Sequence, residues 1–246
     1  MQETRRKFIG KGVCMNRIGI IGAMEIEVAQ LKKDMENAQR VVKAGMEFVE
    51  GTLKGKQAVV VRSGVGKVNA AACAQILADV FECDAVINTG IAGSLNPDIN
   101  IGDIVISTDA VHYDVDAHVF GYAPGQVPQM NVFSFAADES LAQKAVKVCA
   151  RVNPEITARR GRIASGDRFV ADHSVKEWIR NTFHADCCEM EGAAIAQTCY
   201  LNSIPFIIVR AISDKADNSA QEDYDVFEKK AAQHSWQLVE GLMAEI

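Results

Sequence analysis

Short apolar runs and segments of helical periodicity alternate along the chain from Arg17 onward, and this alternation constrains the fold more than any other feature. The first strand and helix show this pattern. Arg17–Gly22 is an apolar run ended by glycine, as buried parallel strands are, and residues 23–36 then carry apolar side chains at helical spacing. Alternating strands and helices are characteristic of α/β domains. We therefore expect a single α/β domain built on a mostly parallel sheet.

An early hairpin makes the predicted sheet mixed. Met46–Leu53 and residues 57–62 have the pattern of strands on either side of Lys54-Gly55-Lys56, which favours a tight turn. The other predicted strands are 85–88, 104–107, 162–165 and 206–211. The other predicted helices are 68–81, 139–151, 175–183, 189–201 and 225 to about 244. The longest irregular stretch, about 112–133, is of a length that is usually functional.

Composition and charge exclude several classes of protein. The 246 residues are 48% hydrophobic and 24% charged, which is typical of a globular chain. The net charge of −6 provides no attraction for nucleic acid or an anionic membrane. No apolar run approaches the ~18–20 residues of a membrane helix. We therefore predict a soluble protein whose partners include neither nucleic acid nor a membrane.

Seven cysteines occur without any CxxC pair. Several, such as Cys73 and Cys199, stand in apolar surroundings, which is typical of free, buried thiols in a reducing compartment. This cysteine usage predicts a cytoplasmic protein. A reactive role for the adjacent Cys187 and Cys188 is the alternative interpretation.

The N-terminal segment differs from the rest. Residues 3–8 read ETRRKF, similar to the start of a twin-arginine export signal, but the 7–15-residue apolar stretch of such a signal does not follow. We interpret residues 1–14 as an upstream extension, disordered or not native, before a domain that begins at Met15 and covers residues 15–246.

Two segments have the residue types of a ligand site without its full pattern. Gly64-Val65-Gly66-Lys67 resembles part of a phosphate-binding loop, but the earlier glycine and the following Ser or Thr of that motif are missing. Residues 112–118 hold two histidines and two aspartates, yet match no complete metal-ligand spacing. We interpret them as polar loop residues and predict no metal site.

Carboxylates follow several of the predicted strands. Glu25 and Glu27 come after the first strand, Glu189 and Glu191 begin a predicted helix, and Asp214 follows residues 206–211. Ligands of open α/β sheets bind at this carboxyl edge. Residues two apart on a helix differ by about 200°, so only one of the first pair can face a pocket. The alternative is that these acids only complement helix dipoles, at about 0.3–1 kcal/mol each.

The order of motifs closely resembles a known family from Met15 to the C-terminal end. The motifs are GIIGAMEIE at 19–27, SGVGK at 63–67, NTGIAG at 88–93, GDIV at 102–105, SGDRF at 165–169, EME at 189–191 and RAISD at 210–214. They resemble bacterial 5′-methylthioadenosine/S-adenosylhomocysteine nucleosidases of the nucleoside phosphorylase-type superfamily. The resemblance implies a three-layer domain with a central mixed, mostly parallel twisted sheet flanked by helices.

The resemblance also implies an activity. It is hydrolysis of the N-glycosidic bond of an adenosine thioether, giving adenine and a 5-thioribose sugar, in the methyl cycle and methionine salvage. It implies Asp214 as the acid that protonates the N7 atom of adenine and Glu27 as the base that takes a proton from water. Because an ordinary aspartate, with a pKa of about 3.9, is protonated in only about one molecule in a thousand at pH 7, the pKa of Asp214 should be raised by burial.

The family also implies the residues that bind substrate. Glu191 matches the ligand of the ribose hydroxyls, Met190 contacts the ribose, Phe169 stacks on adenine, and the backbone of Val170 contacts the base edge. The other implied residues are Met24, Val65, Gly93, Glu189, Ser213, Tyr224 and Phe227. Phe227 could equally be a core residue of its helix. Phe120 and Pro128 match a loop that completes the active site of the neighbouring subunit in a homodimer. No cofactor is implied.

Two positions depart from the family pattern. Ile91 stands where many members have serine, and Ser94 stands where a second glycine is common. Neither departure touches the acid, base or ribose ligand that the resemblance implies, so they leave the substrate preference open but not the reaction class.

Three other functions remain open. A phosphorylase of the same fold would need arginines around a phosphate, where Glu27 is expected instead. Hydrolysis of 6-amino-6-deoxyfutalosine or 5′-deoxyadenosine would use the same catalytic residues. A non-enzymatic nucleoside-binding protein would have no need of both Glu27 and Asp214.

Overall fold

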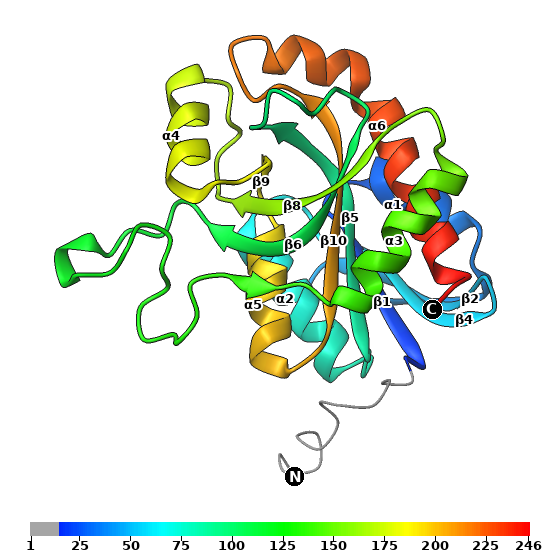
Figure 1. Ribbon diagram of the computed structural model, residues 1–246. Helices are drawn as coiled ribbons and strands as arrows, with labels where there is room; N and C mark the ends of the chain where they lie inside the picture. The colour runs from blue at the N-terminus through cyan, green and yellow to red at the C-terminus, as the bar shows by residue number, and fades with distance from the viewer. Residues whose placement is uncertain (1–14) are drawn as a thin grey trace.

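The predicted alternation of strands and helices is present in the computed structural model, which describes residues 15–246 (Figure 1). The strands are β1 Arg17–Gly22, β2 Glu36–Lys43, β3 Met46–Leu53, β4 Lys56–Arg62, β5 Ala85–Ser94, β6 Ile104–His112, β7 Phe135–Ala136, β8 Ala158–Ser165, β9 Cys187–Glu189 and β10 Phe206–Asp214. The helices are α1 Glu25–Lys33, α2 Lys67–Asp79, α3 Glu139–Val152, α4 His173–Phe183, α5 Gly192–Asn202 and α6 Ala220–Met243. The interpretation of residues 1–14 falls outside the described residues.

All ten strands belong to one mixed sheet, as predicted. Its order is β10-β6-β8-β9-β5-β1-β4-β3-β2, with β7 paired to β6. β10 also pairs with β5, so the strands from β10 to β5 close into a ring. β1 is parallel to both of its neighbours, β4 and β5. The carboxyl ends of β1, β5 and β10 therefore meet at one edge.

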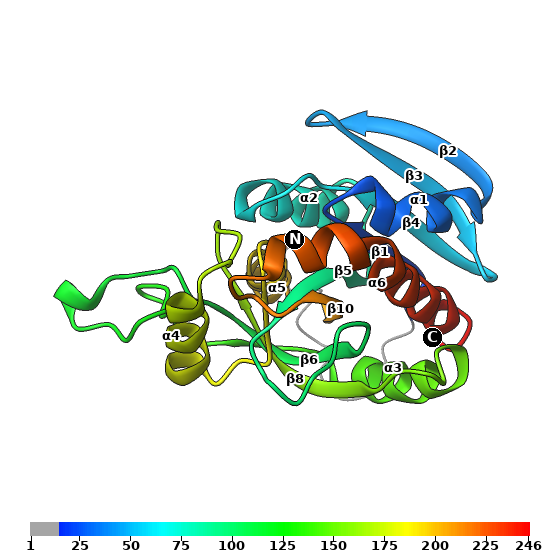
Figure 2. The same cartoon turned by 90° about the horizontal axis from the view of Figure 1, so that it is seen from above.

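Helices cover both faces of this sheet, which confirms the three-layer arrangement (Figure 2). α2 and α5 pack side by side on one face, where their alanines and cysteines allow close contact with the strands. α1, α3 and α6 pack on the other face around the apolar side chains of β1 and β10. α4 lies beside the closed part of the sheet.

Two tight turns explain the antiparallel edge of the sheet. Lys54 and Gly55 both have positive φ, 50° and 80°, as a two-residue hairpin turn requires. This confirms the predicted hairpin, β3–β4. Ala44 and Gly45 repeat the geometry, with φ of 48° and 75°, and form a second hairpin that adds β2. β2 is missing from the sequence prediction because nearly all its side chains are exposed, so it lacks an alternating apolar pattern.

Several element boundaries differ from those predicted. β5 and β10 extend to Ser94 and Asp214, so Asp214 ends its strand rather than following it. Their pairing continues to the Gly93–Asp214 pair, which explains the extension. The helix predicted from Glu189 begins at Gly192, because Glu189 belongs to β9 and pairs with Ser165 of β8.

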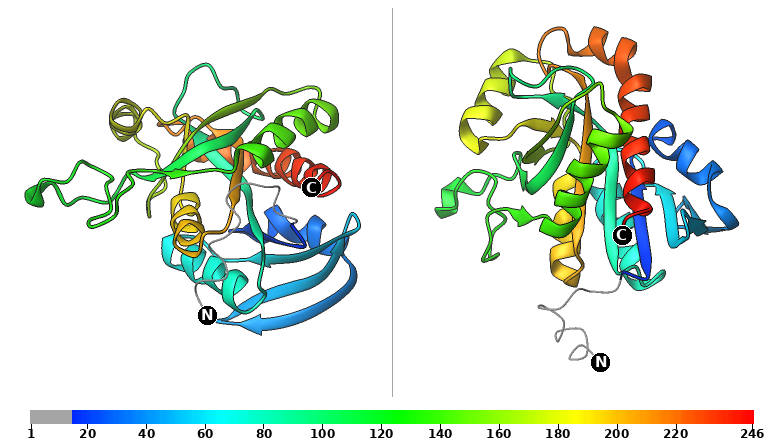
Figure 3. Two further views of the ribbon diagram at one scale, coloured as in Figure 1. Left: turned by 60° about the horizontal axis from the view of Figure 1, so that its bottom comes forward. Right: turned by 45° about the vertical axis from the view of Figure 1, so that its right-hand side comes forward.

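The long irregular segment predicted at 112–133 lies between β6 and β7 and projects from the domain (Figure 3). It contains one short 3-10 turn, His118–Phe120. None of the helices in the described part of the chain is long and apolar enough to cross a membrane. The six cysteines between residues 15 and 246 are free and buried, as predicted, and Cys14 is outside that range.

Candidate active site

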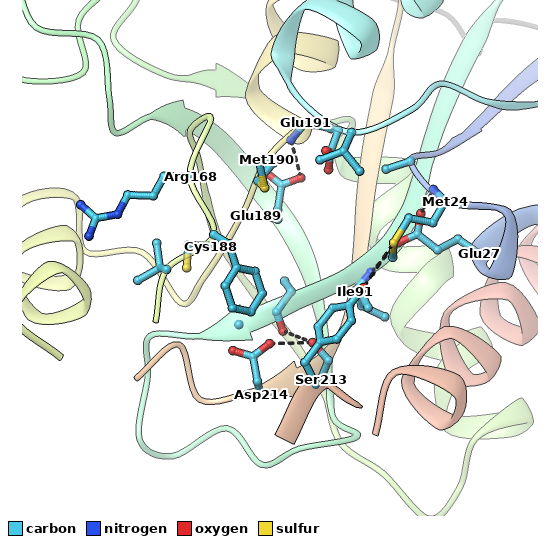
Figure 4. A pocket seen from close by; sticks show the side chains of 17 residues that line it. Met24, Glu27, Ile91, Arg168, Cys188, Glu189, Met190, Glu191, Ser213 and Asp214 are labelled. Carbon is cyan, nitrogen blue, oxygen red and sulfur yellow. Dashed lines mark hydrogen bonds between the residues drawn. The ribbon is translucent and has the colours of Figure 1, made fainter. Parts of the chain in front are cut away.

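A pocket of about 300 Å³ opens where β1, β5, β9 and β10 end (Figure 4). Its volume is at the lower end of the range for small-molecule sites. Most of the predicted site residues line it: Met24, Glu27, Val65, Gly93, Phe169, Val170, Glu189, Met190, Glu191, Ser213, Asp214 and Tyr224. It is also lined by Ala23, Ile91, Ala92, Arg168 and Cys188.

Glu27 stands on the first turn of α1 and is 2% exposed. One carboxylate oxygen accepts a hydrogen bond from the N–H of Met24 at 2.9 Å, and the other accepts one from the N–H of Ile91 at 3.2 Å. Burial raises the pKa of Glu27 above its usual value, while the positive charge of Arg210 and the backbone N–H groups oppose the increase. Burial, the charge of Arg210 and the backbone N–H groups therefore act together on the pKa of Glu27.

Glu25 points elsewhere. Its carboxylate is half exposed and forms an ion pair with Lys32 at 3.0 Å, and it does not line the pocket. The prediction that only one of Glu25 and Glu27 faces the pocket is confirmed.

Asp214 lies across the pocket at the end of β10, 2% exposed. Oδ2 accepts a hydrogen bond from the hydroxyl of Ser213 at 2.8 Å, and Oδ1 accepts one from the N–H of Ala216 at 2.8 Å. Burial raises the pKa of Asp214, and the negative charges of Asp223 and Asp217 add to the increase. The direction is the one predicted for a carboxyl group that donates a proton near neutral pH.

A single buried cation lies among the other acids of the site. Arg210 of β10 is 1% exposed, and its guanidinium forms an ion pair with the carboxylate of Glu189. The same guanidinium donates to Asn88 Oδ1 at 2.7 Å and lies 3.8 Å from Glu191 Oε2. Buried charges are stable only when they are paired in this way.

Glu189 connects this cation to Glu191. Its carboxylate accepts hydrogen bonds from the N–H groups of Glu191 at 3.1 Å and Gly192 at 2.7 Å, and from the hydroxyl of Ser165. Glu191 Oε1 accepts one from the N–H of Gly66 at 2.8 Å. Burial, with repulsion from Glu189, raises the pKa of Glu191 to about 7. Glu189 is therefore a support for Glu191.

Two glycines of β5 provide room for these acids. A Cβ atom on Gly90 would lie 2.7 Å from Glu27 Oε1 and would overlap the guanidinium of Arg210. A Cβ atom on Gly93 would lie 2.7 Å from Asp214 Oδ1. Both distances are too short for any side chain, so glycine lets β5 pass between the two carboxyl groups.

Aromatic and thioether side chains form the apolar part of the pocket. The rings of Phe169 and Tyr224 meet edge to face, with centroids 5.8 Å apart. The hydroxyl of Tyr224 lies 3.2 Å from the sulfur of Met24. Phe169 is 47% exposed, so its ring remains available to a flat ligand.

Three predicted residues do not line the pocket of their own chain. Phe227 is 37% exposed on α6. Phe120 is 81% exposed in the projecting segment, and Pro128 is exposed in the same segment. The fold leaves all three on the surface.

Sequence reasoning did not identify Arg210 and Cys188 as site residues. Arg210 had a recognisable signal, because a charge inside the apolar run of β10 must be paired. Cys188 had none, since its place in the pocket depends on the pairing of β9 with β5. Burial raises the pKa of the Cys188 thiol, which disfavours the reactive thiolate.

The two histidines considered as metal ligands, His112 and His118, have different partners. His112 is buried and its Nε2 lies 2.9 Å from Gln197 Oε1, whereas His118 is exposed and pairs with Asp116. In the part of the chain that the structure describes, no group of three or more His, Cys, Asp or Glu residues could hold a metal ion.

Known proteins match this chain over nearly all of the described residues. A family model described as the phosphorylase superfamily matches residues 17–244. A 5′-methylthioadenosine/S-adenosylhomocysteine nucleosidase of Anoxybacillus flavithermus is 45% identical, over 93% of this chain and 98% of the relative. One of Staphylococcus aureus is 42% identical, over 93% and 100%.

Solved structures give the same result. The nucleosidase of Neisseria meningitidis in complex with methylthio-immucillin-A has a TM-score of 0.91 and 42% identity, over 94% of this chain and 100% of that one. Futalosine hydrolase of Helicobacter pylori has a TM-score of 0.89 and 32% identity, over 94% and 99%. The chain described here belongs to the 5′-methylthioadenosine/S-adenosylhomocysteine nucleosidase family of the phosphorylase superfamily.

Proposed function

We propose that this protein hydrolyses the N-glycosidic bond of 5′-methylthioadenosine and S-adenosylhomocysteine, releasing adenine and the 5-thioribose sugar. The relatives' names support the substrates. One observation of the site carries the chemistry: Glu27 and Asp214, both 2% exposed, line one pocket but have different charged neighbours. A glycosidic hydrolase needs an acid for the leaving group and a base for water.

Asp214 is the acid of the proposed reaction. Adenine leaves readily only when its N7 atom receives a proton. Supplying a proton from an unperturbed aspartate would cost ~4 kcal/mol at pH 7. Burial raises the pKa of Asp214 and lowers that cost. The hydrogen bonds from Ser213 and Ala216 fix the direction of the carboxyl group.

Glu27 is the base. The N–H groups of Met24 and Ile91 and the charge of Arg210 favour its ionised form against the effect of burial. An ionised carboxylate at this position can take a proton from the attacking water. Two carboxyls with separate environments and opposite protonation states are a recurrent solution to this task.

Glu191 binds the ribose. A carboxylate accepts hydrogen bonds from two vicinal hydroxyls and favours the positive charge that develops on the sugar as the bond breaks. Met190 provides an adaptable apolar contact beside it. Phe169 stacks on adenine, and the backbone of Val170 contacts the edge of the base.

A phosphorylase is disfavoured by the charge around Arg210. A phosphate dianion needs a cation that is free to bind it. Arg210 is already occupied by Glu189 and Asn88, and Glu27 would repel the phosphate.

Hydrolysis of 6-amino-6-deoxyfutalosine is the second candidate function. The likeness to a futalosine hydrolase, at 32% identity, supports it. The same acid, base and ribose ligand would serve both reactions, so the difference would lie in the 5′ side of the pocket near Met24 and Phe227. The 42–45% identity to methylthioadenosine nucleosidases favours the first function.

The working unit of the proposed enzyme is a homodimer in the cytoplasm. Phe120 and Pro128 are exposed, in a segment that projects from the domain. Apolar side chains in such a place are typical of an interface. In a dimer they would cover the 5′ side of the partner's pocket.

Adenine release tests the proposal. The protein is incubated with 5′-methylthioadenosine in phosphate-free buffer, with and without added phosphate. Equal release of adenine in both, with free methylthioribose as second product, is expected. Release only with phosphate would show a phosphorylase. Release only from aminodeoxyfutalosine would favour the second candidate.

A further inference from the structure

Lys176 is a buried lysine that the proposed mechanism does not use. It lies on α4 in the same inward stripe as Ile179 and Phe183 and is 8% exposed. A buried ammonium group is costly unless its N–H groups have partners. Its partners therefore indicate what it does.

Those partners lie in the segment between β10 and α6, which passes beside α4 (Figure 1). Lys176 Nζ donates a hydrogen bond to the carbonyl of Lys215 at 2.6 Å. That carbonyl belongs to the peptide unit whose other end, the N–H of Ala216, donates to Asp214 Oδ1 at 2.8 Å. One planar peptide unit thus joins the buried ammonium to the acid of the site.

We propose that Lys176 is a positioning residue for the general acid, and that it acts on Asp214 through the peptide between Lys215 and Ala216. The inference rests on the role of Asp214 in the proposed function. Because the peptide is planar and rigid, holding its carbonyl also fixes the direction of its N–H. A hydrogen bond to the carbonyl polarises the peptide and strengthens its N–H as a donor.

A second contact extends the effect to α6, the helix that carries the pocket residue Tyr224. Lys176 Nζ lies 3.4 Å from Asp217 Oδ2. Asp217 Oδ1 accepts hydrogen bonds from the N–H and hydroxyl of Ser219, the N-cap of α6. α6 carries Tyr224, which lines the pocket. The ammonium therefore connects α4 to both the acid and the start of α6.

The charged and titratable groups around Asp214 determine whether replacing Lys176 raises or lowers the pKa of Asp214. Asp217 and Asp223 act on it from its own segment and from α6, with Tyr224 beside them, and the Cys188 thiol faces it from β9. Removing the ammonium of Lys176 weakens the donor to Asp214 and leaves Asp217 without its counter-charge. Both changes disfavour the ionised form of Asp214, so both raise its pKa.

The test compares Lys176→Met with Lys32→Met. Lys32 has the same side-chain exposure, 10%, and also pairs with a carboxylate, but that partner is Glu25 on α1. The alkaline limb of the pH dependence of kcat/KM for 5′-methylthioadenosine should move up by about half to one pH unit in Lys176→Met. It should stay in place in Lys32→Met. An unmoved limb in Lys176→Met, or equal shifts in both variants, would overturn the proposal.

Two further measurements separate this role from stability and from the proposed function. Lys176→Gln removes the charge but keeps an N–H donor, so a smaller shift in the same direction is expected. If neither variant folds, Lys176 serves stability alone and the proposal is wrong. The ¹³C signal of the Asp214 carboxyl, assigned with Asp214→Asn, titrates whether or not the wild type releases adenine. An unchanged titration in folded Lys176→Met refutes the inference even if the proposed function also fails.

Discussion

Replacing Asp214 by asparagine exchanges a carboxyl group for an amide of nearly the same shape, which has no acidic proton to donate near neutral pH. An asparagine oxygen can still accept from the N–H of Ala216. The Ser213 hydroxyl, which also lies 3.4 Å from the carbonyl of Ala92, can turn to accept from the new amide. The variant should therefore fold normally. General acid catalysis typically contributes about 10²–10⁴-fold, equivalent to about 3–5 kcal/mol of barrier, and kcat should fall by that factor.

The same substitution, which lowers kcat, should raise the stability of the folded protein at high pH. The pKa of Asp214 is raised in the folded protein, so above the unfolded value, about 3.9, the folded state binds more protons than the unfolded state. Wild-type stability then decreases as pH rises from about 4 through the folded pKa. Asparagine has no such loss. Asp214→Asn should therefore melt at a higher temperature than the wild type at pH 8 and at a similar temperature at pH 4.

Two assays check this pair of effects. Adenine release under saturating 5′-methylthioadenosine gives kcat, and thermal unfolding between pH 4 and pH 8 gives the stability difference. A kcat within tenfold of the wild type would remove Asp214 from the role of acid. A difference in Tm that does not change with pH would refute the claim that burial raises its pKa.

Three other substitutions, one of them with a matched control, test the rest of the site. Glu27→Gln should lower kcat by about 10²–10⁴-fold, while Glu25→Gln, two residues away and exposed, should leave it within twofold; equal losses would refute the assignment of the base. Gly90→Ala should reduce stability by about 1–3 kcal/mol in urea unfolding, because its Cβ would overlap Arg210; unchanged stability would contradict that geometry. A cationic ribose analogue should bind the wild type more tightly as pH rises through about 7, where Glu191 loses its proton, and calorimetry on Glu191→Gln should show no such pH dependence.

The sequence predicted where the acids of the site lie better than it predicted their burial and their pKa values. Glu27, Glu191 and Asp214 were found because polar side chains at the ends of buried strands have a recognisable place in an α/β sheet. Their burial was expected only for Asp214. That Glu27 and Glu191 also have raised pKa values depends on how closely β5 and β10 approach them, and no local pattern records that distance.

The missed elements have physical causes as well. β2 has almost no buried side chain and is a strand because the turn at Ala44 and Gly45 places it beside β3. Glu189 has the local sequence of a helix start but belongs to a strand. β8 pairs with Glu189 itself, and β5 pairs with its neighbour Cys188. In both cases tertiary pairing outweighs local preference.

The division between acid and base follows from where one cation lies. Burial raises the pKa of both Glu27 and Asp214, so burial alone does not distinguish the proposed base from the proposed acid. The positive charge of Arg210 opposes that effect at Glu27, whereas the charged neighbours that most affect Asp214 are acids, Asp223 and Asp217. The register of β10 sets this asymmetry, because it carries Arg210 and Asp214 four residues apart on one strand. Arg210 lowers the pKa of Glu27, the proposed base, and pairs with Glu191, the proposed ribose ligand, whereas the acids beside Asp214 raise the pKa of the proposed acid.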